Sequence, residues 1–248
     1  MSKHGLFESK VTLEPVLHTY SCDKGNAYKS VTTLLKMIGE DFQDTFAYKN
    51  ATEEKRAEWK AKGVKAASDG TRIHNALELY AEMGQISELD QELEAAIKSI
   101  HEEYKGYNKL HNEICLYHDD FKVAGTADRI CAISNRKDCA VDIADFKTSG
   151  SKGIQFYSDY GKRFYPPFEH LHDCNYNKYS FQLSIYAYFF EQLTSRKVRQ
   201  LYIHFIPLDD PMNHRKIPVT YLKTDVLLLL EKYKQQIPVP QLNEDEEF

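Results

Sequence analysis

Apolar residues recur at helical spacing through the first half of the chain, and start signals divide them into four predicted helices. Ser30 is typical of an N-cap before a short helix, and Thr52 is suited to cap a second helix that extends to about residue 67. Gly70 opens a third helix, and a fourth covers about 88–107. Residues 1–30 contain turn-forming residues without this periodicity, so we expect them to be irregular.

After residue 110 the apolar residues alternate or run together, as they do in strands. Three such segments, separated by turn-forming clusters, predict a meander of antiparallel strands. The three strands of the meander are predicted at 113–117, 122–133 and 139–146, and an aromatic segment follows them. After that segment we expect a helix at 178–193, a strand at 198–208, a short strand at 219–222 and a helix at 225–236. This order predicts an α/β fold, with a mixed central β-sheet flanked by helices.

The composition fits a chain with a substantial core. Hydrophobic residues make up 42% of the 248 residues and charged residues 28%, which excludes general disorder. We expect a single domain over 1–240, with a helical part at about 30–110, a core at about 111–235, and an acidic disordered tail at 241–248. No apolar run approaches the roughly 20 residues of a membrane-spanning helix, so we expect no membrane contact.

The cysteines indicate the cell compartment of the chain, and its net charge limits how it can bind nucleic acid. The five cysteines are scattered without a Cys-x-x-Cys pair, and the first residues lack the apolar stretch of a secretory signal. We therefore expect a cytoplasmic location, the host cytoplasm if a phage encodes the chain. The net charge of -5 argues against binding nucleic acid by bulk positive charge. Four of the acids lie at 244–247, however, so local basic patches remain open.

The predicted meander holds the most informative polar residues. Asp145 and Lys147 lie two apart on one strand, so both side chains leave the same face of the sheet. Asp128 lies on the preceding strand, where a hairpin brings it close to Asp145, and nearby Gly125 leaves room for a ligand. Adjacent carboxylates repel unless they bind a divalent cation, and oxygen ligands favour Mg²⁺ or Mn²⁺. The alternative is a surface ion pair, but apolar neighbours within 141–146 favour a buried strand.

Four short motifs resemble those of the RecB-like branch of the PD-(D/E)XK nucleases, and they follow one another along the chain in the family's order. Gly-Thr-Ala-Asp at 125–128 and Asp-Phe-Lys-Thr at 145–148 are similar to its strand motifs. Residues 70–78 resemble its upstream helical motif, in which a histidine is a metal ligand. Gln-Leu-Ser-Ile-Tyr at 182–186 resembles its downstream helix, which lies against the active site and the DNA. The match spans about 70–190, most of the predicted domain.

The resemblance implies a restriction-endonuclease-like core and a metal-dependent DNA exonuclease of replication, recombination or repair, a type frequent in bacteriophages. Its substrate is DNA, single-stranded or double-stranded with ends. It implies Mg²⁺ or Mn²⁺ held by His74, Asp128, Asp145 and the Phe146 carbonyl. Asp128, Asp145 and Lys147 are the implied catalytic residues, with Lys147 positioning the attacking water. The alternatives are a structure-specific or restriction-type endonuclease, and a non-catalytic DNA-binding or recombination scaffold on the same fold.

Two further acids are candidate ligands, and two other metal chemistries have to be weighed. Glu78 lies one helical turn after the motif's histidine, and Glu113 opens the first meander strand, where related nucleases sometimes place an acid. Some family members carry an iron–sulfur cluster on cysteines after the Gln-x-x-x-Tyr helix. This chain has no cysteine after Cys174, so we expect no iron–sulfur cluster. His-x-His-x-Cys at 170–174 offers zinc-capable ligands but lacks an obvious fourth.

Most of the expected DNA contacts lie in the aromatic segment after the meander. Between 152 and 168, cationic and aromatic residues are interleaved, so that bases stack on rings while cations meet phosphates. The alternative is a loop whose rings pack inward. With the Gln-x-x-x-Tyr helix, the expected DNA contacts are Thr148, Lys152, Tyr160, Arg163, Phe164, Gln182 and Tyr186. The lysine-rich helix before residue 67 also carries glutamates, which favour an ordinary solvated face.

The acidic tail ends in Glu-Asp-Glu-Glu-Phe at 244–248 and resembles the C-terminal tip of bacterial single-strand-binding proteins. This resemblance implies docking on a replication or recombination protein, with Phe248 as the anchor and the acids as steering charges. The alternative is a tail that only keeps the chain soluble.

Overall fold

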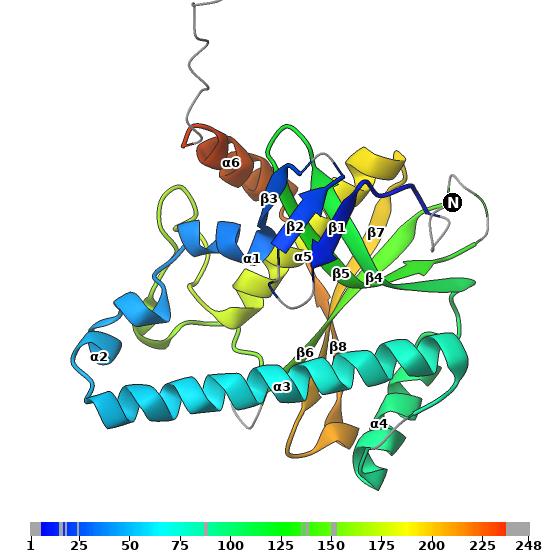
Figure 1. Cartoon of the computed structure of the whole chain (residues 1–248), viewed down its shortest axis with the longest axis horizontal. Helices are drawn as coiled ribbons and strands as arrows, with labels where there is room; N and C mark the ends of the chain where they lie inside the picture. Colours follow the sequence, from blue (N-terminus) through cyan, green and yellow to red (C-terminus); the bar gives the residue numbers. More distant parts are fainter. Residues whose placement is uncertain are drawn as a thin grey trace, which may run out of the picture.

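The computed structural model describes residues 6–14, 17, 19–23, 25–86, 89–134, 136, 139–149 and 153–236. Within them, eight strands form a sheet with helices packed on both faces (Figure 1). The strands are β1 (Val11–Glu14), β2 (Thr19–Cys22), β3 (Ala27–Ser30), β4 (Lys109–His118), β5 (Val123–Ala132), β6 (Val141–Ser149), β7 (Val198–Pro207) and β8 (Arg215–Val219). The α-helices are α1 (Val31–Leu34), α2 (Phe46–Lys49), α3 (Glu53–Met83), α4 (Gln91–Glu102), α5 (Asn175–Thr194) and α6 (Lys223–Lys234). The 3-10 turns are η1 (Leu35–Met37), η2 (Phe42–Asp44), η3 (Asp159–Gly161) and η4 (Pro211–Asn213).

The sheet is mixed, and its centre is made by the predicted meander. The strand order is β1-β2-β3-β5-β6-β7-β8, with β4 paired to β5 outside this path. β4, β5 and β6 form antiparallel pairs, β7 runs parallel to β6, and β8 returns antiparallel to β7. These pairings confirm an α/β fold with a mixed central sheet flanked by helices.

Two apolar layers hold the helices on opposite faces of the sheet. α5 is buried along most of its length and packs with α6 on one face. α3 and α4 pack on the other face through Ile73 and Ile97, above Phe146 of β6. Because side chains alternate along a strand, Asp145 and Lys147 leave β6 on the face opposite to Phe146, toward α5.

The expectation that residues 1–30 are irregular is wrong for the described part of that range. β1 and β2 form an antiparallel hairpin, and β3 pairs with β2 and then runs parallel to β5. Each of these strands has only four residues, with a single buried side chain in each: Val11, Tyr20 and Tyr28. So short a pattern gives no readable alternation, and the partner of β3 lies far away in the sequence.

The predicted second and third helices are one helix, α3, which begins at the expected Thr52 cap and continues through Gly70. At Gly70 the helix passes close to β6, since a Cβ there would lie 3.3 Å from the Thr148 hydroxyl. The glycine therefore marks a close approach and not a helix start. Before Ile73, α3 buries no side chain, so its first turns extend along the molecule without a core contact.

The remaining elements follow the predicted order with shifted ends. α5 begins at 175 and not at 178, and β8 lies at 215–219 and not at 219–222. The predicted short helix after Ser30 corresponds to α1 continued by η1, whereas α2, η2, η3 and η4 have no counterpart among the predicted elements. No helix in the described ranges is long and apolar enough to cross a membrane. Lys152 and the tail at 241–248 lie outside the described residues.

Candidate active site

The candidate site lies where the central sheet divides. β5 pairs with β6 only as far as Arg129, opposite Ala144. At its other end β5 pairs with β3, where Ala124 lies opposite Ser30. β6 meanwhile continues along β7 to Ser149. We call this point, where β5 and β6 part, the fork; it carries Asp128 on one strand and Asp145 on the other.

Asp145 is the most buried acid at the fork, with 1% of its surface exposed. Its carboxylate forms an ion pair with Lys147. Apart from that pair, neither carboxylate oxygen has a hydrogen-bond partner in the described part of the chain. Burial raises the pKa of Asp145, the Lys147 charge opposes the rise, and the Asp128 charge adds to it.

Asp128 and His74 meet at the backbone of Phe146. An Asp128 Oδ2 atom accepts a hydrogen bond from the Phe146 amide at 2.6 Å, and His74 Nδ1 lies 3.7 Å from the same oxygen. The other ring nitrogen of His74, Nε2, is 3.0 Å from the Phe146 carbonyl oxygen. The structure thus brings together His74, Asp128 and the Phe146 carbonyl, three of the four groups assigned to metal binding, and the Asp128 charge also acts on Asp145, the fourth.

Glu113 joins this cluster from β4 on an unusual backbone. Its φ is +50°, in the left-handed region that non-glycine residues rarely adopt, in the middle of a strand. Its carboxylate lies within 4.8 Å of the ligand atoms of His74 and Asp128. Loss of hydration, followed by the charges of Asp128, Glu78 and Asp145, raises the pKa of Glu113 to about 8. The Glu78 charge therefore acts on Glu113, but it is Glu113 whose carboxylate lies among the possible ligand atoms of His74 and Asp128.

The residues at the fork fit a hard divalent cation. Carboxylate oxygens, a backbone carbonyl and one imidazole converge, which is an oxygen-rich donor set suited to Mg²⁺ or Mn²⁺. The buried oxygens of Asp145 that lack hydrogen bonds are the atoms such a cation would satisfy. The described residues supply a single close ammonium, that of Lys147, against these acids.

Side chains of helix α5 contact residues at the fork. The Lys147 ammonium lies 4.9 Å from the centre of the Tyr179 ring, a contact absent from the sequence-based candidates. Gln182 donates a hydrogen bond to the Tyr186 hydroxyl at 2.9 Å. Tyr186 is buried, and its ring fills the space beside Gly125. The expectation that Gly125 leaves room for a ligand is therefore wrong, because a protein side chain occupies that room.

A buried arginine holds α3 near the fork, and no sequence motif indicated it. Arg129 donates hydrogen bonds to the Asn112 side chain at 2.9 Å and to the Leu77 carbonyl of α3 at 3.0 Å. Its guanidinium also lies 4.8 Å from the Phe146 ring centre. Because Leu77 is one turn from His74, these contacts position the helix that carries the histidine.

The expected DNA contacts separate into outward and inward residues. Tyr160 is fully exposed, and Arg163 is exposed while donating a hydrogen bond to the His170 carbonyl at 3.1 Å. Thr148 is half-buried on β6, next to Gly70. Phe164 is buried and packs edge-on against Phe181 of α5, so a core contact replaces the expected base contact at this residue.

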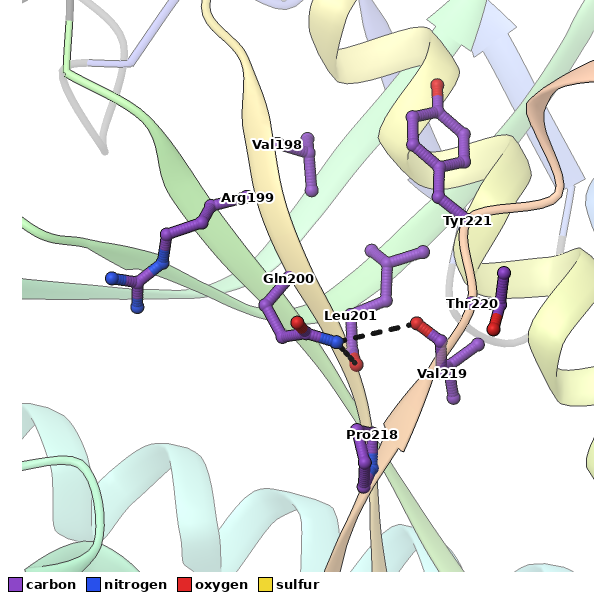
Figure 2. Close-up of a pocket in the computed structure, with 8 residues that line it drawn as sticks. All are labelled: Val198, Arg199, Gln200, Leu201, Pro218, Val219, Thr220 and Tyr221. Atoms are coloured by element: carbon purple, nitrogen blue, oxygen red, sulfur yellow. Dashed lines mark hydrogen bonds between the residues drawn. The ribbon is translucent and has the colours of Figure 1, made fainter.

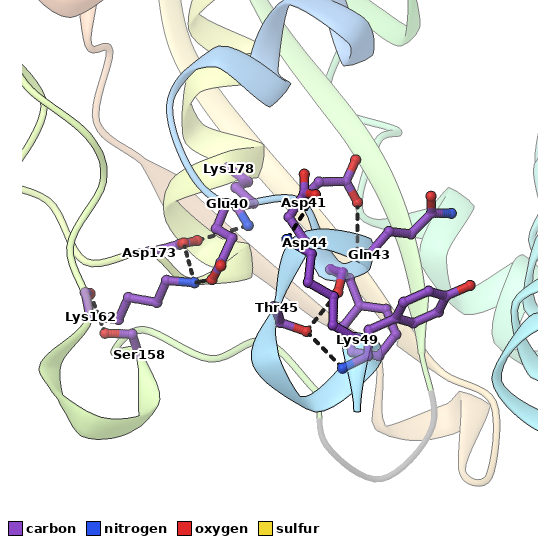
Figure 3. Close-up of polar contacts among 12 residues, drawn as sticks. Glu40, Asp41, Gln43, Asp44, Thr45, Lys49, Ser158, Lys162, Asp173 and Lys178 are labelled. Atoms are coloured by element: carbon purple, nitrogen blue, oxygen red, sulfur yellow. Dashed lines mark hydrogen bonds and ion pairs between the residues drawn. The ribbon is translucent and has the colours of Figure 1, made fainter. Parts of the chain in front are cut away.

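A hollow of 290 Å³ adjoins the fork, bordered by Tyr179 and Gln182 of α5 and by η1 and η2. Figure 3 shows that cations near it are paired. Lys162 lies 2.7 Å from Glu40 and 3.5 Å from Asp173, and Lys178 lies 2.7 Å from Asp173. The rim of this hollow is therefore a balanced polar network.

Two other places do not contribute to the fork. A hollow of 390 Å³ lies where β7 and β8 part, and Figure 2 shows it lined by 198–201 and 218–221, none of them a residue of the fork. The zinc-capable residues at 170–174 are not brought together as a ligand cluster in the described structure. His170 contacts Asp225 at 3.2 Å, and His172 contacts Ser158 at 3.2 Å.

Comparisons with known proteins show no family for this chain. No family model matches the sequence, and no curated protein matches it. Among solved structures, a "putative exonuclease" from Eubacterium rectale is similar at 16% identity and a TM-score of 0.41, covering 84% of this chain and 81% of its own. A protein named SSO0001 is similar at 17% identity and a TM-score of 0.31, covering 71% and 78%.

Proposed function

We propose that this chain is a metal-dependent nuclease of the RecB-like PD-(D/E)XK type that hydrolyses DNA phosphodiesters from an end. The proposal rests on Asp145, a buried carboxylate that is paired with Lys147 and has no other hydrogen-bond partner in the described structure, at a fork shared with Asp128 and His74. Burying such a group costs several kcal/mol, so a purely structural role would be poorly served by it. A site that binds a cation gives these charges a use.

The residues that would hold the cation are Asp128, Asp145, His74 and the Phe146 carbonyl, with Glu113 beside them. A divalent cation supplies polarisation of the scissile phosphodiester and a more acidic bound water. His74 keeps its ring in place through the Phe146 carbonyl, and Asp128 through the Phe146 amide. Both ligands are thereby oriented by the backbone of the same residue of β6.

Lys147 acts as a fixed positive charge. Burial lowers the pKa of Lys147, but the nearby charges of Asp145 and Asp128 outweigh that effect and raise it. The protonated ammonium, held between Asp145 and the Tyr179 ring, orients the attacking water and offsets charge at the reacting phosphate.

The hollow beside Tyr179 and Gln182 is where we place the DNA strand. Tyr179 belongs to both the hollow and the contact with Lys147, so a strand lying there reaches the fork. Exposed Tyr160 is a candidate for base stacking further along the strand.

An activity assay with matched variants tests the proposal. End-labelled linear DNA, single- and double-stranded, and covalently closed circles are incubated with Mg²⁺, Mn²⁺ or EDTA. We expect cleavage of linear DNA with either metal and none with EDTA. Asp145→Asn is expected to lower the rate by about 100-fold or more, the scale of losing an electrostatic group at a reacting centre, while DNA binding persists through phosphate contacts elsewhere.

The controls separate the alternatives. Asp209→Asn changes an exposed acid away from the fork and is expected to leave cleavage unchanged. Cleavage of closed circles, which have no ends, would show that the chain is an endonuclease and not an exonuclease. DNA binding without cleavage under every metal condition would instead favour the non-catalytic scaffold, and wild-type rates in Asp145→Asn would show that the site is assigned wrongly.

A further inference from the structure

A second cluster of potential ligands lies on the opposite face of the sheet from Asp145. His204 is on β7, in register with Phe146, and is completely buried. His214 follows η4 at the start of β8, and 7% of its side chain is exposed. Glu103 directly follows α4, which lies beside the connection between β7 and β8 (Figure 1). Three segments that are distant in the sequence therefore meet at this point.

The ligand atoms have the spacing of a metal site. His204 Nε2 lies 3.1 Å from His214 Nδ1, and His214 Nδ1 lies 3.3 Å from a Glu103 carboxylate oxygen. All three ligand atoms are within 4.8 Å of one another. A tetrahedral Zn²⁺ with bonds of about 2.0–2.1 Å holds its ligand atoms about 3.3–3.5 Å apart. The observed separations are close to that spacing before any adjustment.

Each histidine is also oriented by its second ring nitrogen. His204 Nδ1 is 3.1 Å from the Tyr104 hydroxyl, and His214 Nε2 is 3.0 Å from the Ser99 hydroxyl. Both Tyr104 and Ser99 belong to the α4 region, which also supplies Glu103. Metal-binding histidines characteristically use the nitrogen that does not bind the metal in this way, which fixes the ring and its tautomer.

Some charges around the cluster favour a bound cation and others oppose it. Burial, followed by the charges of His214, Lys216 and Arg129, lowers the pKa of His204 to about 3, so its imidazole is neutral near pH 7. Lys216 and Arg129 also repel a cation. The Lys216 ammonium is held over the rings of Tyr104 and Tyr202, 4.3 Å from each centre, and the Glu103 carboxylate supplies the compensating negative charge.

We propose that His204, His214 and Glu103 form a zinc site that ties α4 to β7 and β8, with a water as the fourth ligand. Two imidazoles and one carboxylate suit Zn²⁺, whereas the oxygen-rich fork suits Mg²⁺. A direct hydrogen bond between the two imidazoles, without metal, is the competing account of the same 3.1 Å contact.

Zinc retention tests the site without depending on nuclease activity. The full chain carrying Asp128→Asn and Asp145→Asn is stripped with EDTA, loaded with ZnCl₂, dialysed, and its metal content measured by mass spectrometry. We expect about one retained zinc per chain and a higher unfolding temperature. Loading with Co²⁺ is expected to give the d–d absorption of tetrahedral cobalt.

Matched variants in the same background show which residues hold the metal. His214→Gln and Glu103→Gln are expected to abolish retention, and Ser99→Ala to weaken zinc affinity by about 10–100-fold. His170→Gln and Glu102→Gln, a histidine and a glutamate outside the cluster, are expected to retain it. Glu103 is exposed, so its variant is expected to fold even if a histidine variant does not. A folded parent that retains no zinc, or zinc that survives both Glu103→Gln and His214→Gln, would overturn the proposal.

Discussion

At the residue scale, Gly125 shapes the fork by having no side chain. A Cβ at this position would lie 2.7 Å from a ring carbon of Tyr186 and 2.9 Å from a methyl group of Val31. Real Cβ atoms do not come so close, and both neighbours are buried in the core. The contact with Tyr186 fixes the height of α5 above β5, and through Gln182 it reaches the hollow beside the fork.

Gly125→Ala is therefore expected to lower the free energy of unfolding by about 1–3 kcal/mol, the usual cost of overpacking a core. Gly63→Ala is the matched control, because a Cβ at Gly63 meets nothing within 4 Å on exposed α3. It is expected to raise the free energy of unfolding by up to about 1 kcal/mol through helix propensity. Urea unfolding of both variants measures the difference, and equal effects would contradict this account of the fork.

At the element scale, Glu191 joins the end of α5 to β7 and α6. Its carboxylate accepts hydrogen bonds from Lys223 at 2.7 Å and from the Val198 amide at 3.3 Å. Burial raises the pKa of Glu191, but these two hydrogen bonds outweigh it, and the pKa is lower than the usual 4.5. A group whose pKa is lowered by folding contributes stability above the unfolded value, and that stability is lost as pH falls through the folded value.

Glu191→Gln is expected to be less stable than wild type by about 1 kcal/mol at pH 7, the scale of a partly exposed charged hydrogen bond. The difference is expected to shrink as pH falls below 4.5, where the wild-type carboxylate becomes protonated. Urea unfolding at a series of pH values tests this, with exposed Glu231→Gln as the control. A difference that stays constant with pH would show that shape, and not charge, holds this junction.

The same scale shows what the chain's periodicity can predict. The meander, α4 and α5 have long patterns, and their positions follow from the sequence to within a few residues. The break predicted in α3 is wrong because the reason for Gly70 lies in another element, at Thr148 of β6. Phe164 shows the same limit, since nothing local reveals that its ring meets Phe181.

The candidate site was predictable in part for a related reason. Asp128 and Asp145 lie next to the last paired residues of two neighbouring strands, Arg129 and Ala144, so the predicted hairpin already brings them side by side. Arg129 and the left-handed backbone of Glu113 have no signal in a single sequence. Both depend on how distant elements pack against the sheet.

At the scale of the whole molecule, folding concentrates negative charge at the fork. In the unfolded chain these acids are dispersed, so a cation gains its full set of ligands only in the folded state. The proposed function therefore predicts that Mg²⁺ stabilises the native chain, by about 2.7 kcal/mol at 100 times its dissociation constant.

Thermal unfolding in a Mg²⁺ titration, at ionic strength matched with NaCl, measures this effect. We expect the unfolding temperature to rise with Mg²⁺ in wild type and in Asp209→Asn, and to change little in Asp145→Asn. An equal rise in all three proteins would mean that Mg²⁺ acts on the surface in general and not at the fork.

The division of the sheet also has a consequence for synthesis on the ribosome. Asp128 and Asp145 are made close together, but β3, made near the beginning of the chain, and β7, made near its end, hold the two arms of their fork. Parallel pairings of this kind are non-local and form late. A nascent chain therefore cannot hold both arms of the fork until β7 has left the exit tunnel, and before that point the two acids lack the frame that brings them together.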